Sequence, residues 1–185
     1  MRQRFFRPGF LLFFALLAML FLLPSIASAA SCVSEGTENW TGGFDCDGIP
    51  DQTPTSTDTV TILSGHTITV DTGAAESGAL TVEAGATLDI PAGYTLTANG
   101  DVTVDGDLSG VGAYLYFYGA TLTNTGSSIS VDNVYFYRTG TQTITGVGSW
   151  TGTGTLTIGY DSSTVLANDV TMTFSDYLVN GSFSL

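Results

Sequence analysis

The chain has 185 residues, of which 17 are acidic, four are basic and one is histidine, so its formal net charge is −13 at pH 7. All four basic residues are arginines, and the chain contains two cysteines. A chain with so few cations can neither neutralise the phosphates of a nucleic acid nor adhere to an anionic membrane surface. Nucleic acids and anionic membranes are therefore excluded as partners.

Residues 1–29 have the three parts of a secretory signal peptide. A start with three arginines precedes an apolar run over 10–23, and Ala-Ser-Ala at 27–29 is a small-residue cleavage site. The run is shorter than the roughly 20 residues that span a bilayer. We expect a secreted or bacterial cell-surface protein, cleaved before Ala30 and not inserted in the membrane afterwards. The mature chain then carries one arginine against 17 acidic residues, a formal charge of −16.

Residues 30–57 are polar and irregular, and are expected to cap the region that follows. Export to an oxidising compartment predicts a disulfide between Cys32 and Cys46. Lipidation of Cys32 is the alternative, although the residues before it lack the bulky aliphatic residue that this modification uses. Trp40 is expected to cover the open end of the first repeat.

Alternate aspartates occur inside this cap. Asp45, Asp47 and Asp51, with Gly48 after the second, resemble one unit of the aspartate-rich calcium-binding repeats of extracellular proteins. Alternatively, these residues are only the Ile-Pro segment that precedes the repeat region, without a bound ion. Calcium is therefore a candidate ligand, and no other cofactor is expected.

Short runs of alternating apolar and polar residues fill 58–185, and glycine separates them every six to eight residues. Alternation with Thr, Val and Ile indicates strands, and glycine or asparagine indicates tight corners. These glycines, with one asparagine, form three series in which successive members are 19 to 22 residues apart: 78, 100, 119, 140; 85, 106, 126, 146; and 93, 112, Asn133, 154. We predict an all-β, right-handed parallel β-helix (β-solenoid) of three-sided coils of about 20 residues. Antiparallel hairpins turning at Gly100 and Gly106 are the rival.

This phasing predicts a single core that runs through all the coils. The inward residues are predicted to be Val82, Leu88, Leu96, Val102, Val104, Leu108, Leu115, Leu122, Ile129, Val131, Phe136 and Ile144. The last coil shows no polar cover, so we expect the repeats to continue beyond residue 185.

The motifs of 39–110 resemble a known group of proteins. Ile49-Pro50, then 58–62 (Asp-Thr-Val-Thr-Ile), 65–67 (Gly-His-Thr) and Gly85-Ala86-Thr87-Leu88 look like the start of the glycine-rich, right-handed β-helix regions of bacterial secreted and cell-surface proteins. The resemblance implies a stalk or adhesin, and some β-helices of similar shape are polysaccharide lyases or hydrolases.

Tyrosines gather in the third series of strands. Counting from the corners at 112 and 133 places Tyr114 over Tyr135 and Tyr116 over Tyr137, with Arg138 next to them. Coils lie about 4.8 Å apart, so these rings would stack. The patch is either a ladder that stabilises the sheet or a contact surface for an extracellular glycan or protein.

Residues able to carry out catalysis are scarce. Asp101, Asp105 and Asp107 lie close together, but the mature chain supplies only one arginine as a basic partner, and His66 lacks a nucleophile or a second histidine. Repeated Thr-apolar-Thr triplets are similar to ice-binding faces but keep no constant interval. We therefore expect a non-catalytic structural or adhesive module, and the alternative is the N-terminal part of a carbohydrate-active enzyme.

Overall fold

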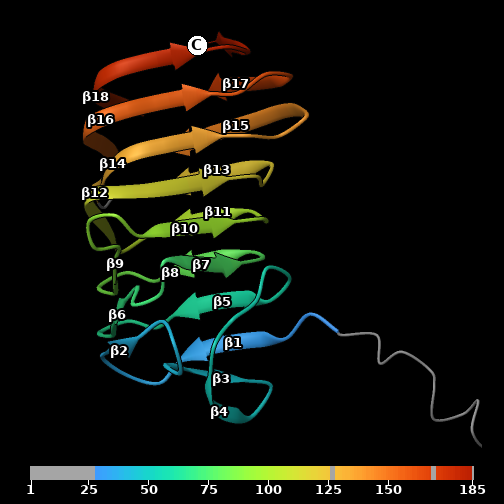
Figure 1. Ribbon diagram of the computed structural model, residues 1–185, viewed down its shortest axis with the longest axis vertical. Helices are drawn as coiled ribbons and strands as arrows, with labels where there is room; N and C mark the ends of the chain where they lie inside the picture. The colour runs from blue at the N-terminus through green and yellow to red at the C-terminus, as the bar shows by residue number, and fades with distance from the viewer. Residues whose placement is uncertain (1–27, 126–127, 168–169, 185) are drawn as a thin grey trace, which may run out of the picture.

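A computed structural model describes residues 28–125, 128–167 and 170–184, and within these ranges the chain is all-β, with no helix. The strands stack along one long axis as a parallel β-solenoid of about six turns (Figure 1). The predicted signal peptide lies outside the described residues, apart from its last two. None of the described segments is a helix long and apolar enough to cross a membrane.

Each coil has three sides. Face A contains β1 (Ser31–Ser34), β5 (Thr59–Ile62), β8 (Leu80–Val82), β11 (Val102–Val104), β13 (Thr121–Asn124), β15 (Gly140–Gly146), β17 (Ser162–Leu166) and β19 (Ser182–Ser184). Face B contains β2 (Glu38–Asn39), β6 (Thr67–Thr69), β9 (Thr87–Asp89) and the first halves of β12 (Asp107–Phe117), β14 (Ser128–Phe136), β16 (Ser149–Ile158) and β18 (Thr171–Val179). Face C contains β7 (Ala74–Ser77), β10 (Thr95–Ala98) and the second halves of those four long strands.

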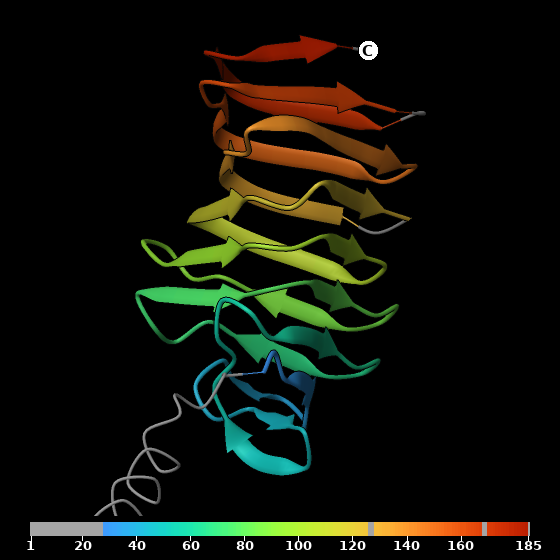
Figure 2. The same ribbon diagram turned by 90° about the vertical axis from the view of Figure 1, so that its right-hand side faces the viewer.

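The pairing between coils is parallel, as the glycine phasing predicted. Val60 pairs with Leu80, Leu80 with Val102, and Val102 with Leu122, so face A advances by 20 to 22 residues at each turn. The hairpin alternative is wrong, because Gly100 donates its N–H to Gly78 O in the preceding coil and does not turn the chain back on itself. Figure 2 shows the same stack from the side.

Alternation along the strands produces the core. Every one of the twelve residues predicted to point inward is at most 1% exposed, which confirms that prediction. Aromatic side chains fill the upper part of the core, where Phe136 lies between Phe117 and Trp150 with ring centroids 5.7 and 6.3 Å away. Burial of such side chains stabilises a fold by roughly 1.5–3 kcal/mol each.

Two different physical reasons explain the recurring glycines. Gly85 and Gly93 have φ near +80°, as expected for corners. Gly100 and Gly119 do not; there a Cβ would come within 2.7 and 2.1 Å of the backbone of the coil below. Asn133 lies inside β14, where the strand passes from face B to face C, and it lacks the positive φ expected of a tight corner.

The cap is a continuation of the solenoid as well as a cover for it. Strand β1 pairs with β5, and β2 pairs with β6, both in parallel, whereas β3 (Phe44–Cys46) and β4 (Ile49–Gln52) pair antiparallel below them. The predicted disulfide is present and joins Cys32 of β1 to Cys46 of β3.

The predicted position of Trp40 is also confirmed. Its side chain is fully buried and contacts Phe44 edge to face, with ring centroids 5.2 Å apart. The backbone N–H of Trp40 donates to Thr69 O in the first coil at 2.7 Å. At the other end, β18 and β19 leave Tyr177, Leu178 and other apolar side chains exposed.

Candidate functional site

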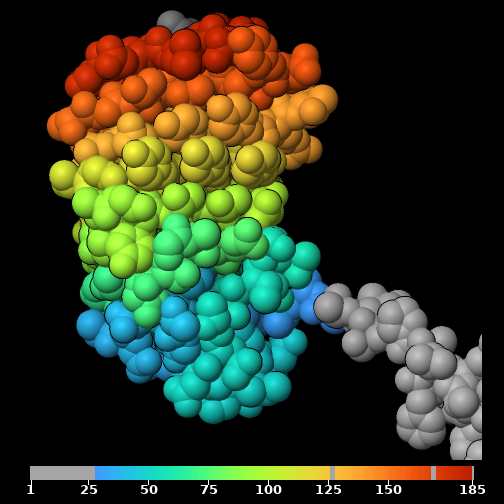
Figure 3. All heavy atoms as spheres, in the orientation of Figure 1, coloured from blue at the N-terminus to red at the C-terminus, as the bar shows by residue number. Residues whose placement is uncertain are grey.

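Five tyrosines form an outward surface on face C, which we call the tyrosine face. Tyr114, Tyr116 and Tyr118 come from β12 and the residue after it, whereas Tyr135 and Tyr137 come from β14 and the residue after it. The residues between them, such as Leu115, Phe117 and Phe136, are completely buried, so the strand alternation itself turns the tyrosines outward. In the space-filling view the side chains of successive coils form a continuous stack (Figure 3).

The register of these tyrosines differs from the prediction by two residues. Tyr116 pairs with Tyr135 and Tyr114 with Asn133, while Tyr137 N donates to Phe117 O and so lies above Tyr118. The predicted pairs, Tyr114 with Tyr135 and Tyr116 with Tyr137, are therefore diagonal neighbours.

An unmatched bulge causes this shift. The register of β12 against β14 breaks between Gly110 and Tyr114, where β12 has three residues and β14 has only Asp132 between Val131 and Asn133. Asp132 accepts a hydrogen bond from Gly112 N at 2.6 Å, which holds the bulge. Sequence reasoning missed Tyr118, although its position two residues after Tyr116 continues the same alternation.

The rings of the tyrosine face are stacked. Tyr116 and Tyr135 have centroids 4.6 Å apart and planes only 9° apart, close to the usual spacing of two coils. The diagonal contacts, Tyr114–Tyr135 at 6.4 Å and Tyr116–Tyr137 at 6.1 Å, join the rings into one group. The ring faces of Tyr116 and Tyr135 therefore cover each other, and their edges and hydroxyls are left for a partner.

Small residues border the group along the axis. Thr97 precedes Tyr116 in the row and Thr157 follows Tyr135. Beside them, the ring of Tyr137 lies over Gly159, where an added Cβ would come within 2.1 Å of the ring. Gly159 thus allows that ring to lie flat on the next coil.

Tyr116 and Tyr135 have raised pKa values. Burial is the main cause, and the neighbouring tyrosines add to it because two phenolates would repel each other. Both hydroxyls therefore stay neutral at physiological pH and can donate as well as accept hydrogen bonds. Arg138, the predicted cationic neighbour, is exposed just after Tyr137, and its backbone N–H donates to Ser162 Oγ at 3.0 Å.

Two of the three aspartates of the predicted calcium site take part in hydrogen bonds within the cap. Asp47 Oδ1 accepts a hydrogen bond from Ser31 N, Asp51 N donates to Glu35 Oε2, and both aspartates have positive φ. In the described part of the chain, no group of three or more His, Cys, Asp or Glu residues is arranged to hold a metal ion. Calcium binding by Asp45, Asp47 and Asp51 stays a prediction.

The other polar residues singled out in the sequence link coils to each other. Asp101 Oδ1 accepts hydrogen bonds from Ala120 N and Thr121 N at 2.8 and 2.9 Å. Asp105 accepts from Thr125 Oγ1. His66 Nδ1 contacts Ser34 Oγ at 2.8 Å, a partner the sequence did not reveal. Ser34 is only 2% exposed and also accepts from Leu63 N, so its hydroxyl is not open to a substrate.

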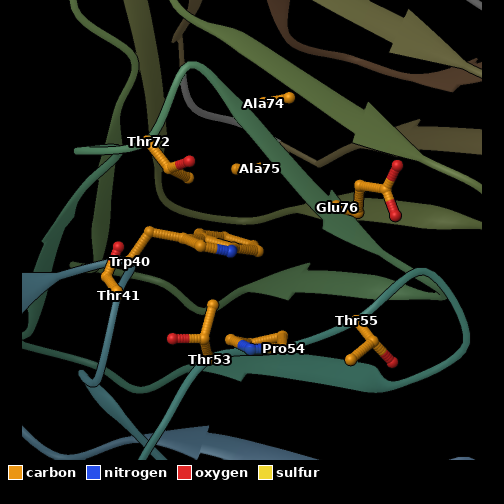
Figure 4. A pocket seen from close by; sticks show the side chains of 9 residues that line it. All are labelled: Trp40, Thr41, Thr53, Pro54, Thr55, Thr72, Ala74, Ala75 and Glu76. Carbon is orange, nitrogen blue, oxygen red and sulfur yellow. The ribbon is translucent and has the colours of Figure 1, made fainter.

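A small hollow lies beside the cap (Figure 4). It has a volume of about 270 Å³, and its lining includes Trp40, Thr53, Pro54, Thr72 and Glu76. Trp40 Nε1 is buried and has no hydrogen-bond partner in the structure. Threonine hydroxyls and the Glu76 carboxylate contribute polar groups to this hollow.

Comparisons of the chain with protein-family models, with curated proteins and with solved structures gave no match in any of the three.

Proposed function

We propose that this protein is a secreted or cell-surface β-solenoid module with a structural and adhesive role, without catalytic activity, and that the tyrosine face is its contact surface. The observation that carries the proposal is the stacking of Tyr116 on Tyr135 within a group of five tyrosines on one flat side of the solenoid. Tyrosine combines a large rigid surface with a hydroxyl, which suits it to molecular contacts.

The stacking also suggests what the surface contacts. A sugar that stacks on an aromatic residue uses the ring face, but the facing sides of Tyr116 and Tyr135 are already covered. Ring edges and a group of neutral hydroxyls fit a flat protein surface better, and a neutral glycan is the second choice. The mature charge of −16 would repel an anionic polysaccharide.

The surroundings of the polar residues support a non-catalytic role. Asp101 and Asp105 accept hydrogen bonds between coils, and the Ser34 hydroxyl that contacts His66 is buried. The resemblance of 39–110 to β-helix regions of bacterial surface proteins supports display outside the cell. Repetition of one coil gives a rigid spacer, which is the form a stalk requires.

The test is a double substitution, Tyr116→Thr with Tyr135→Thr, because threonine already occupies this row at Thr97 and Thr157. We expect adhesion of protein-coated beads to extracellular matrix proteins, or to immobilised dextran and cellulose, to fall at least tenfold, while circular dichroism stays unchanged.

The matched control changes two outward residues in adjacent coils of face A, Thr103→Ala with Thr123→Ala. This variant should bind as the wild type does. If the tyrosine variant keeps full adhesion and only its melting temperature falls, the tyrosines hold the coils together and the module is a spacer.

A further inference from the structure

Ala30 is the point at which the chain enters the fold. Its N–H donates to Asp58 Oδ1 at 2.7 Å, and its carbonyl accepts from Thr59 N at 2.9 Å. Ser28 and Ala29, directly before it, are exposed and form no strand, whereas β1 begins at Ser31. The boundary between exposed chain and fold therefore coincides with the cleavage position expected from the sequence.

The surroundings of Asp58 favour its negatively charged form. Its side chain is only 7% exposed, and Oδ2 accepts hydrogen bonds from Thr55 N and Thr55 Oγ1 at 2.8 and 2.7 Å. Burial by itself raises the pKa of Asp58, but these bonds and the one from Ala30 outweigh it, so the pKa is lowered and the group is ionised at neutral pH. Oδ1 accepts from Ala30 N.

We propose that cleavage between Ala29 and Ala30 creates an α-ammonium group that forms an ion pair with Asp58 and latches the cap onto the first coil. This inference rests on the export part of the proposed function and is independent of the tyrosine face. A signal peptidase adds one water across the Ala29–Ala30 peptide bond. The Ala29 carbonyl carbon takes the hydroxyl and leaves as a carboxylate, while Ala30 N keeps the bonding electrons and becomes NH₃⁺.

Cleavage would strengthen an existing contact. Before it, a neutral amide donates to the carboxylate; after it, donor and acceptor are both charged, so the attraction between opposite charges adds to the hydrogen bond. The pair links the start of β1 to Asp58, directly before β5, at the base of the solenoid. The other acidic group near this point is the exposed Asp47, whose Oδ1 accepts from Ser31 N at 3.1 Å.

The composition allows a selective test. The mature chain contains no lysine, so the α-amino group of Ala30 would be its only primary amine. Acetylation of this amine, with hydroxylamine to reverse any tyrosine ester, would remove the ammonium charge and leave every side chain unchanged.

The experiment expresses the full chain, purifies the exported protein and determines its first residue by intact mass and N-terminal sequencing. We expect the chain to begin at Ala30. Acetylation should lower the melting temperature of the wild type by about 2–4 °C, the shift that 1 kcal/mol produces in a domain of this size. It should do the same in Asp47→Asn, the exposed control, and should have no effect in Asp58→Asn.

A pH series gives a second measurement on the wild type alone. The ion pair raises the pKa of the α-ammonium group above its usual value of about 8, so its contribution is complete below pH 8 and is lost as pH rises through the raised pKa. The melting temperature of the free protein should therefore approach that of the acetylated protein between about pH 8 and pH 10.

The outcomes separate clearly. A first residue other than Ala30 overturns the proposal, and so does an unchanged melting temperature after acetylation of the wild type. An equal loss in Asp58→Asn overturns the role of Asp58. If Asp58→Asn does not fold, the acetylated wild type and the pH series still decide. None of these results depends on adhesion, so failure of the tyrosine face to bind would be seen separately.

Discussion

Individual carboxylates in this protein hold neighbouring coils together. Asp132 is 9% exposed and accepts hydrogen bonds from Gly112 N, Thr153 N and Thr153 Oγ1, so one side chain connects three successive coils. Asp71 does the same between the cap and the first coil, through Thr41 N and Thr41 Oγ1. The strongly acidic composition is therefore partly structural, because backbone N–H groups at the corners need acceptors.

The pH dependence of stability follows from these bonds. Burial raises the pKa of Asp132, but the hydrogen bonds from Thr153 and Gly112 outweigh it, and the pKa is lowered. A carboxylate with a lowered pKa contributes stability above its unfolded value of about 3.9, and this is lost as pH falls through the folded pKa. We expect a falling melting temperature below about pH 4.

Substitution tests the contribution of this carboxylate. Asp132→Ala should destabilise the fold by about 1–3 kcal/mol in urea unfolding, because it removes a buried carboxylate that accepts hydrogen bonds from Gly112 N and Thr153 N. It should also flatten the loss of stability in acid. The control is Asp107→Ala, at an exposed strand position, and equal losses in both variants would contradict the assignment.

Strands and corners depend on glycine where coils come closest. At Gly119 a Cβ would lie 2.1 Å from Gly100 O and 2.7 Å from the ring of Phe117, so there is no space for alanine. At Gly73 nothing lies within 4 Å, and the backbone is not in the left-handed region. Two glycines in similar sequence surroundings thus have opposite tolerance.

The two glycines can be compared directly. Gly119→Ala should cost about 1–3 kcal/mol, the usual cost of overpacking, because the coils must move apart. Gly73→Ala should change stability by at most about 1 kcal/mol and in the stabilising direction, since it restricts the unfolded chain. Urea unfolding measures both, and a stable Gly119→Ala protein would show that the spacing of the coils can adjust.

The whole molecule is a one-dimensional stack whose lower end is closed by the cap. Strand β1 pairs with β5, and the Cys32–Cys46 disulfide joins β1 to the antiparallel β3. Each coil contacts mainly its neighbours, so loss of the cap exposes the first coil and unfolding can proceed from there.

Removal of the disulfide tests this view. The two cysteines are 14 residues apart, and closing a loop of that length stabilises a protein by about 3 kcal/mol. Cys32→Ser with Cys46→Ser should lose about 2–3 kcal/mol, and hydrogen exchange should increase first in β1, β5 and β6. Uniform exchange along all coils would instead indicate that the solenoid opens as one unit. Thiol titration of the wild type should find no free cysteine.

The resemblance to bacterial surface β-helices was reached through local motifs, and the fold agrees with it at the level of architecture. The twelve core residues were predictable because alternation of apolar and polar residues is a local property of a strand. The disulfide was predictable because the sequence contains only two cysteines.

The amino-acid sequence by itself determined the coil length, the inward residues and the presence of tyrosines on one outward face, since each follows from spacing along the chain. Only the tertiary structure decided which tyrosines meet. Strand β12 has a bulge at 111–113 that β14 lacks. Its two extra residues shift the register, so that Tyr116 lies on Tyr135 and Tyr118 lies next to Tyr137. Contacts between coils depend on register, and register is set by hydrogen bonds such as Asp132 to Gly112, which join residues 20 positions apart.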